Sequence, residues 1–437
     1  MAYSVHVKEA TMIKPSDTTP SRLLSLSALD SQLFLRFTVE YLFVYKSRPG
    51  LDQNITKSRL KTSLSKILVP YYPMAGRVRA KSGGSGLEVV CKAQGAVFIE
   101  ATSDCTIKDF DRAPTYVTQW RKLLSVPVTD VLKGDPVVVV QLTWLKDGAA
   151  TLGVGINHCV CDGIGGGEFL NSLASLAAFE CRVTDLKPKP VWDRQLLDPI
   201  KPPRPYPVNH QEFNRVPDLG GFISRFSKER LIPTSVSFDK RCLNELKRAA
   251  LRLSTTQPSG LTFTSFEVLS AHVWRSWARA LNLPPNQMLK LLFSINIRNR
   301  VKPSLPSGYY GNAFVLGCAQ ASVKDLSEKG LGYASLLIKN AKDRVNNDYV
   351  RSVVQSVSLS RASPDSVGVL IMSQWSRLGL EMVDFGMGRP VHVGPICCDR
   401  YCLIVPVHSQ TDAVKVVVAV PASSVDKYEC LVQSAHM

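Results

Sequence analysis

Seven prolines fall between residues 187 and 207, close to the middle of this 437-residue chain. Proline fixes the φ angle and lacks a backbone N–H, so the segment cannot be a regular helix or a central strand. A chain of this length also exceeds what one hydrophobic core usually supports. We therefore predict two domains, residues 1–186 and 211–437, joined by an extended crossover linker at residues 187–210. The prolines are Pro188, Pro190, Pro199, Pro202, Pro203, Pro205 and Pro207.

Both halves of the chain mix two residue patterns. Short runs of β-branched and apolar residues predict strands, and apolar residues three or four positions apart predict helices. The fold class that follows is α/β or α+β, with substantial mixed sheet. Strands are predicted at residues 87–91, 136–145, 151–156 and 414–420, and helices at 60–68, 168–179 and 266–281.

The charge balance is basic, with 53 Lys and Arg against 36 Asp and Glu and a formal net charge of +17. Such a surplus attracts polyanions, among them nucleic acids and phosphorylated small molecules. The basic residues are scattered, however, and no zinc-finger, RNA-recognition or basic-zipper pattern is present. We therefore expect no nucleic-acid partner, and we expect the surface charge to favour a phosphate-bearing ligand.

Cysteine usage and hydropathy bear on the cellular compartment. The eleven cysteines are irregularly spaced, and Cys159 and Cys161 lack the two-residue gap of a zinc knuckle, so we expect reduced thiols and no metal site. No apolar run approaches the ~18 residues of a membrane span, and the N-terminus lacks the apolar core of a signal peptide. These features predict a cytosolic protein.

The segment that carries the clearest chemistry begins where the predicted strand 151–156 ends. His158 follows that strand, then Asp162, then four glycines between residues 163 and 167. We expect a tight glycine turn here, with a helix beginning at Glu168. An imidazole held in such a place titrates near neutrality and suits proton abstraction from a hydroxyl or an amine. From these residues alone, a core histidine is an equally good interpretation, and Asp162 could orient the histidine or hold the loop through a basic partner.

Six segments of the chain resemble the plant BAHD acyltransferases. Residues 158–163 (HCVCDG) match the HxxxDG motif of that family, and residues 384–388 (DFGMG) match its DFGWG motif, with Met387 in place of tryptophan. The resemblance covers nearly the whole chain, and the segments keep the family's order. The others are residues 27–30 (SALD), 70–77 (PYYPMAGR), 266–275 (FEVLSAHVWR), and 298–300 (RNR) with 308–312 (GYYGN).

The resemblance implies two chloramphenicol-acetyltransferase-like domains, each a mixed β-sheet with flanking helices, and an active site in a channel between them. It implies direct transfer from an acyl-CoA co-substrate, with His158 as the general base, no acyl-enzyme and no permanently bound cofactor. The expected product is an ester of an alcohol acceptor, in plant specialised metabolism. An amine acceptor is the alternative, as is a catalytically silent relative that only binds CoA esters. We also expect a monomer.

The resemblance also implies roles for individual residues. Asp162 is expected to pair with Arg298 of the second half rather than to act as acid or base. Trp375 holds the spacing to Asp384 of a tryptophan implicated in hydroxycinnamoyl transfer, so we favour a hydroxycinnamoyl or other aromatic donor over an acetyl or fatty-acyl one. A packed core tryptophan is the alternative for Trp375. Asp384 is expected to be structural, or else a second active residue, and Arg298 and Arg300 are candidate contacts for the CoA phosphates.

Overall fold

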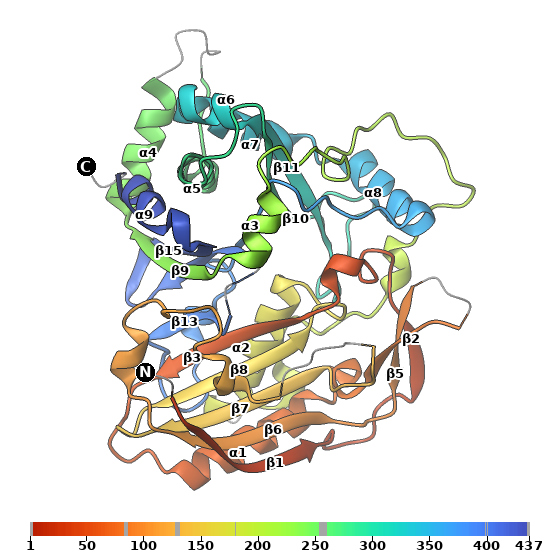
Figure 1. Cartoon of the computed structure of the whole chain (residues 1–437). Coiled ribbons are helices and arrows are strands. Elements are labelled where there is room, and N and C mark those ends of the chain that lie inside the picture. The colour runs from red at the N-terminus through yellow and green to blue at the C-terminus, as the bar shows by residue number, and fades with distance from the viewer. Residues whose placement is uncertain are drawn as a thin grey trace.

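The chain folds into two six-stranded sheets with flanking helices and a smaller three-stranded sheet (Figure 1). This arrangement confirms the predicted mixed α/β fold with two sheet-containing halves. The computed structural model describes residues 3–82, 86–126, 132–179, 181–252, 260–397, 399 and 401–434.

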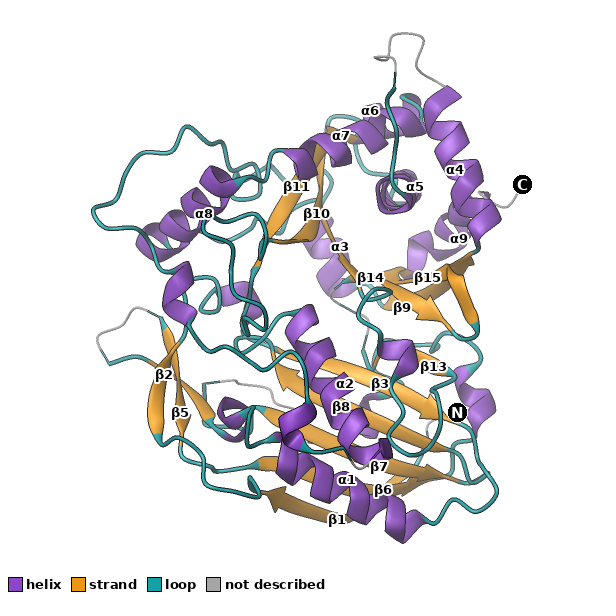
Figure 2. Ribbon diagram, turned by 180° about the vertical axis from the view of Figure 1, so that it is seen from behind, coloured by secondary structure: helices purple, strands orange, loops and turns teal. Residues whose placement is uncertain are grey.

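The first sheet belongs mainly to the N-terminal half. Its two central strands, β7 and β8, are buried along their whole length, because apolar residues occupy both faces. Helices α1 (Gln53–Ile67) and α2 (Gly163–Phe179) pack side by side on one face of the sheet (Figure 2). In order across the sheet, the strands are β1 (Val5–Ile13), β6 (Ala96–Ser103), β7 (Val138–Leu145), β8 (Ala150–Asn157), β3 (Thr38–Tyr45) and β13 (His392–Pro395).

The second sheet and most of the remaining helices form the C-terminal half. Helix α5 is buried on nearly every side, and its Trp274 and Trp277 lie in the hydrophobic core of this half. Figure 1 looks almost along the axis of this helix. The strands are, in sheet order, β11 (Phe314–Ser322), β10 (Met288–Asn296), β12 (Val369–Gln374), β14 (Cys402–Val407), β15 (Gln410–Pro421) and β9 (Leu231–Phe238). The helices are α3 (Phe222–Lys228), α4 (Lys240–Arg252), α5 (Ser265–Ala280), α6 (Val323–Glu328), α7 (Leu331–Asp343), α8 (Asn347–Ser360) and α9 (Val425–Gln433).

Short elements complete the described chain. The small sheet has the order β2 (Arg22–Ser25), β5 (Leu87–Cys91) and β4 (Arg77–Ala80). The 3-10 helices are η1 (Leu33–Leu35), η2 (Tyr72–Ala75), η3 (Ile107–Phe110), η4 (Arg121–Leu124), η5 (Val183–Asp185), η6 (Arg194–Leu197), η7 (Leu380–Met382) and η8 (Ala422–Ser424).

The C-terminal half contributes a strand to the first sheet. Although β13 lies late in the sequence, it pairs with β3 and so completes the edge of that sheet. Residues 187–210 contain one short 3-10 helix, η6, and otherwise run as irregular chain. The boundaries at residues 186 and 211 stay a prediction. Within the described residues, no helix is long and apolar enough to cross a membrane.

One predicted element is wrong at its start. The glycines at residues 163–167 do not form a turn ahead of the helix, because α2 already begins at Gly163. Asp162 explains this, since its carboxylate accepts a hydrogen bond from the N–H of Gly165 and its carbonyl accepts one from Gly166. Because glycine has no side chain, other groups can approach this helix closely. A Cβ on Gly166, for example, would collide with the Tyr41 hydroxyl.

Candidate active site

His158 stands immediately after β8, and its backbone is fixed by two separate segments. Its N–H donates to the carbonyl of Phe37 at 2.9 Å, and its carbonyl accepts from the side-chain amide of Asn312 at 2.7 Å. Phe37 precedes β3 of the first sheet, whereas Asn312 lies just ahead of β11 of the second. The imidazole is therefore carried at the junction between the two halves.

Two aromatic rings flank the imidazole of His158. The ring of Phe37 lies 5.1 Å from it and that of Phe314 lies 6.0 Å from it, and Tyr401 packs on Phe37 at 5.5 Å. Burial lowers the pKa of His158, and the opposing effects of its own backbone and of the Asp162 charge do not restore it. The imidazole is thus neutral at neutral pH, which is the state that a general base requires.

Both oxygens of the Asp162 carboxylate are held by donors. Arg298 donates to Oδ2 through Nη1 at 2.8 Å and to Oδ1 through Nη2 at 3.2 Å. The N–H of Ala313 donates to Oδ2 at 3.0 Å, and that of Gly165 donates to Oδ1 at 2.9 Å. Burial alone would raise the pKa of Asp162, but Arg298 and the other donors outweigh it and hold that pKa below its usual value. Asp162 is therefore a charged residue that ties the loop after β8 to the second half.

The two arginines expected at the CoA phosphates make other contacts. Arg298, besides its ion pair with Asp162, donates to the carbonyls of Tyr309 and Gly311. Arg300 donates to the carbonyls of Lys342 and Val345 at the end of α7. Their role in CoA binding stays a prediction.

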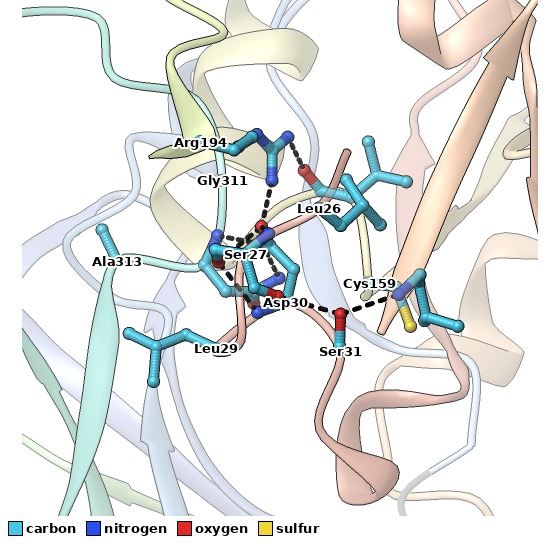
Figure 3. A network of polar contacts seen from close by, with 12 residues as sticks. Leu26, Ser27, Leu29, Asp30, Ser31, Cys159, Arg194, Gly311 and Ala313 are labelled. Carbon is cyan, nitrogen blue, oxygen red and sulfur yellow. Dashed lines mark hydrogen bonds and ion pairs between the residues drawn. The ribbon is translucent and has the colours of Figure 1, made fainter. Parts of the chain in front are cut away.

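A second, fully buried network braces the same loop (Figure 3). Asp30 accepts from Arg194 Nη1 at 2.7 Å, from the N–H and side-chain amide of Asn312 at 2.8 and 2.9 Å, and from the Ser27 hydroxyl at 2.8 Å. Arg194 also donates to the carbonyl of Val160 at 2.7 Å. The chain from Arg194 through Asp30 and Asn312 thus reaches the carbonyl of His158, and it positions the loop without touching the imidazole.

The two cysteines beside His158 are poor nucleophiles. Burial raises the pKa of both Cys159 and Cys161 to about 12, so each is a protonated thiol at neutral pH. None of the ten cysteines within the described ranges forms a disulfide with another of them, and Cys398 lies outside those ranges. A covalent acyl-enzyme on a cysteine is therefore disfavoured.

Trp375 follows β12 and lies against the first sheet. Its ring packs on that of Tyr41 at 4.7 Å, and only 6% of its surface is exposed. This contact fits the packed-core interpretation, and a tryptophan held so firmly could equally aim its indole N–H at an oxyanion. The role of Trp375 in the reaction stays a prediction.

Asp384 closes a loop of its own. Its Oδ1 accepts from the N–H groups of Gly386 and Gly388, both at 2.8 Å, and the two glycines adopt φ angles of +85° and +86°. Phe385 packs edge-on against rings of β3, and Met387 is 1% exposed in the core. None of the described contacts of Asp384 involves His158 or Asp162.

A cavity of about 750 Å³ lies beside α2, within the size range of ligand pockets. The residues that line it include Glu168 of α2, Lys187 of the linker, and Arg377 and Leu378, which follow Trp375 closely in the sequence. Burial raises the pKa of Glu168, and the nearby Arg298 only partly opposes this. His158 is not among the described residues that line the cavity.

Comparison with known proteins identifies the family. The family model described as "Transferase family" matches residues 3–432. The chain belongs to this family, the BAHD acyltransferases. Omega-hydroxypalmitate O-feruloyl transferase of Arabidopsis thaliana is 33% identical over 97% of this chain and 92% of its own length. Fatty alcohol:caffeoyl-CoA acyltransferase of the same plant is 33% identical over 97% of this chain and 96% of its own.

Solved structures agree on the fold of this BAHD acyltransferase. Vinorine synthase superposes with a TM-score of 0.75 at 19% identity, covering 97% of this chain and 96% of its own. Family membership confirms the predicted activity class, an acyltransferase that uses an acyl-CoA co-substrate. Asp30 and Asn312 lie in segments that resemble the family, but no local pattern predicted Arg194 or the network. The reason is the distance along the chain, since Arg194 lies 164 residues and Asn312 lies 282 residues from Asp30.

Proposed function

We propose that this protein transfers an aromatic acyl group of the hydroxycinnamoyl type from CoA to the hydroxyl of an alcohol, with His158 as general base. The observation that carries the proposal is a neutral imidazole, fixed at the end of β8 and flanked by the rings of Phe37 and Phe314, with Tyr401 packed on Phe37. Flat aromatic acyl groups pack well among such rings. The feruloyl and caffeoyl donors in the names of two relatives support the same donor class.

The acyl group is transferred directly from CoA to the acceptor through a tetrahedral intermediate, without an acyl-enzyme. His158 takes the proton of the acceptor hydroxyl while its oxygen attacks the thioester carbonyl, so that a C–O bond forms and an oxyanion develops. The C–S bond then breaks, and the imidazolium returns the proton to the departing CoA thiolate. Trp375 is our candidate donor to the oxyanion through its indole N–H.

The other predicted residues act through position rather than through proton transfer. Asp162 and Arg298 hold the loop that carries His158, and Asp384 holds the loop around Met387. We assign the cavity beside α2 to CoA, with Lys187 and Arg377 supplying positive charge for its phosphates. Arg300 remains a second candidate for a phosphate contact.

We place this activity in the cytosol, in a monomer. The lack of disulfides among the described cysteines supports a reducing compartment. Fractionation of plant cells that express the tagged protein tests the compartment, and light scattering on the purified protein tests the monomer.

A CoA-release assay tests the proposed reaction. Hydroxycinnamoyl-CoA esters and acetyl-CoA are each offered with primary alcohols and with amines, to the native protein and to His158→Ala. We expect the highest kcat/KM with a hydroxycinnamoyl donor and an alcohol, and a loss of about 10²–10⁴-fold in His158→Ala. His6→Ala, at an exposed position on β1, is the matched control and should keep full activity.

Three results would contradict this function in distinguishable ways. Unchanged turnover in His158→Ala would remove the general base. Preference for an amine would make the protein an N-acyltransferase. Absence of turnover with every donor, together with measurable binding of CoA esters, would make it a silent binding protein.

A further inference from the structure

A buried polar cluster lies just beyond the linker, in a part of the molecule that the proposed reaction does not use. Glu212 is 2% exposed, and its Oε1 accepts a hydrogen bond from the Tyr349 hydroxyl at 2.7 Å. The Nδ1 atom of His210 lies 2.9 Å from the same oxygen, and the other ring nitrogen lies 2.8 Å from the Ser352 hydroxyl. One oxygen of the Glu212 carboxyl therefore has two partners.

The other oxygen of Glu212 is not satisfied. Oε2 is buried, and none of the described residues offers it a hydrogen bond. A buried carboxyl oxygen left in this state is costly, and buried polar atoms in folded proteins almost always have a partner. The position thus calls for a group that the described part of the chain does not supply.

A cavity adjoins this residue. Its walls are mostly apolar, including Phe34, Phe213, Phe314 and Val353, and its polar members are Glu212 and Gln32. The volume is about 10 Å³, which is close to the least that admits one water-sized group. A space of this size beside an unsatisfied carboxyl oxygen admits one small polar group, such as a water or a hydroxyl.

Phe314 connects this cavity to the reaction centre. One ring lines the cavity and also lies 6.0 Å from the imidazole of His158. The two residues before it hold the catalytic loop, since Asn312 donates to the carbonyl of His158 and Ala313 donates to Asp162. Phe314 is therefore a wall of the cavity and a neighbour of the base at the same time.

We propose that Glu212 Oε2 and this cavity bind a hydroxyl group that a substrate carries away from its reacting atom, and that this contact sets substrate preference. The inference rests on the proposed acyl transfer and extends it to specificity. A hydroxyl fits better than an ammonium because it both donates and accepts, and so matches the carboxyl in either protonation state. The hydroxyl belongs either to the acyl acceptor or to the ring of the acyl donor.

Paired substrates that differ by one hydroxyl test the proposal and identify its carrier. In the donor arm, cinnamoyl-CoA is compared with p-coumaroyl-CoA; in the acceptor arm, primary alkanols are compared with the matched terminal diols. The readout is the ratio of kcat/KM for the hydroxylated member to that for its partner. We expect the native protein to favour the hydroxylated member in one arm.

Two variants act on the site in different ways. Glu212→Gln keeps an oxygen for Tyr349 and replaces the unsatisfied Oε2 with an N–H₂ group. Val353→Ile adds a methyl group to the wall of the cavity and leaves the carboxyl in place. We expect each to lower the ratio about tenfold, which corresponds to the loss of one hydrogen bond. Glu245→Gln, on the outer surface of α4, is the matched control and should leave the ratio unchanged.

The outcomes separate this inference from the general function. A native protein with no preference in either arm, or variants that slow both members equally, would overturn the hydroxyl site and leave a structural water as the occupant. If no CoA ester is turned over at all, the proposed function fails instead. Calorimetry of the same substrate pairs, with the native protein and with the Glu212→Gln variant, then still decides whether the hydroxyl is recognised.

Discussion

Two aspartates of this molecule are each followed by glycines, Asp162 at the start of α2 and Asp384 in the loop before β13, yet their contacts reach to different parts of the fold. Asp162 reaches across to Arg298 and Ala313 of the C-terminal half. Asp384 accepts hydrogen bonds from N–H groups of its own loop, at Gly386 and Gly388. The motif that contains Asp162 thus couples the two halves through a buried charge, whereas the motif that contains Asp384 closes a turn through neutral backbone donors.

The energetic consequence follows from what each carboxylate leaves behind when it is removed. Without Asp162, the guanidinium of Arg298 would remain in a largely buried site without its ion-pair partner, and of the described residues only the Glu168 carboxyl nearby would oppose its charge. Without Asp384, two backbone N–H groups would lose an acceptor, but no charge would be uncovered. The first loss is therefore expected to be the larger of the two.

The largest effect is expected from Asp162→Ala. Loss of one partner from a buried ion pair costs about 3–5 kcal/mol of unfolding free energy, and the misplaced loop should also lower kcat. Urea unfolding and CoA-release kinetics measure the two effects. Simultaneous removal of Arg298 should restore part of the stability, because the guanidinium that lost its partner is then gone. Full stability in the single variant would mean that the Asp162–Arg298 ion pair does not stabilise the fold.

A smaller effect is expected from Met387→Trp, which restores the residue of the family motif. Met387 is 1% exposed and belongs to the core that includes Phe385 and Tyr45. A larger ring in a filled core costs about 1–3 kcal/mol, without any change in the pairing of Asp162. Thermal unfolding measures this loss, with Met387→Leu as the volume-matched control. A stabilised tryptophan variant would mean that the loop is underpacked.

Asp384→Ala should cost about 1–2 kcal/mol, the value of two hydrogen bonds from backbone N–H groups. Asp384→Asn keeps the Oδ1 acceptor and should cost less, whereas Asp162→Asn gives up the charge that Arg298 requires. Denaturant unfolding of the alanine and asparagine variants at both positions gives a direct ranking. Equal losses for asparagine at both positions would show that charge matters at neither loop.

Local patterns in the sequence predict the strand before His158, but they do not predict where α2 begins or which distant residues pair. The strand before His158 was evident from its β-branched run, and the structure extends it to β8 (Ala150–Asn157). The start of α2 was missed because glycine is a poor helix former, a penalty that the cap at Asp162 and the close approach of Tyr41 overcome here. Arg194 and Glu212 were not indicated by a local pattern, since Arg194 pairs with Asp30 and Glu212 binds Tyr349, which lie 164 and 137 residues away.

The smallest expected effect concerns the pH dependence of kcat/KM, and only the substitution of Asp162 should change it. Burial lowers the pKa of His158, while the Asp162 charge acts in the opposite direction. An ordinary imidazole would be only about one quarter neutral at pH ~6, so the native enzyme should keep more of its kcat/KM at that pH. In Asp162→Asn the charge that stabilises the imidazolium is gone, and the acid limb of kcat/KM should move to still lower pH.

Asp384→Asn is the control for that shift, since none of its described contacts joins its side chain to the imidazole. Its acid limb should coincide with that of the native enzyme, measured as kcat/KM over the range in which each variant stays folded. A shift to higher pH in Asp162→Asn would mean that the aspartate disfavours the imidazolium, contrary to its charge. An equal shift in both variants would mean that the pH dependence reports folding rather than the base, because of the two aspartates only Asp162 acts on the proton of His158.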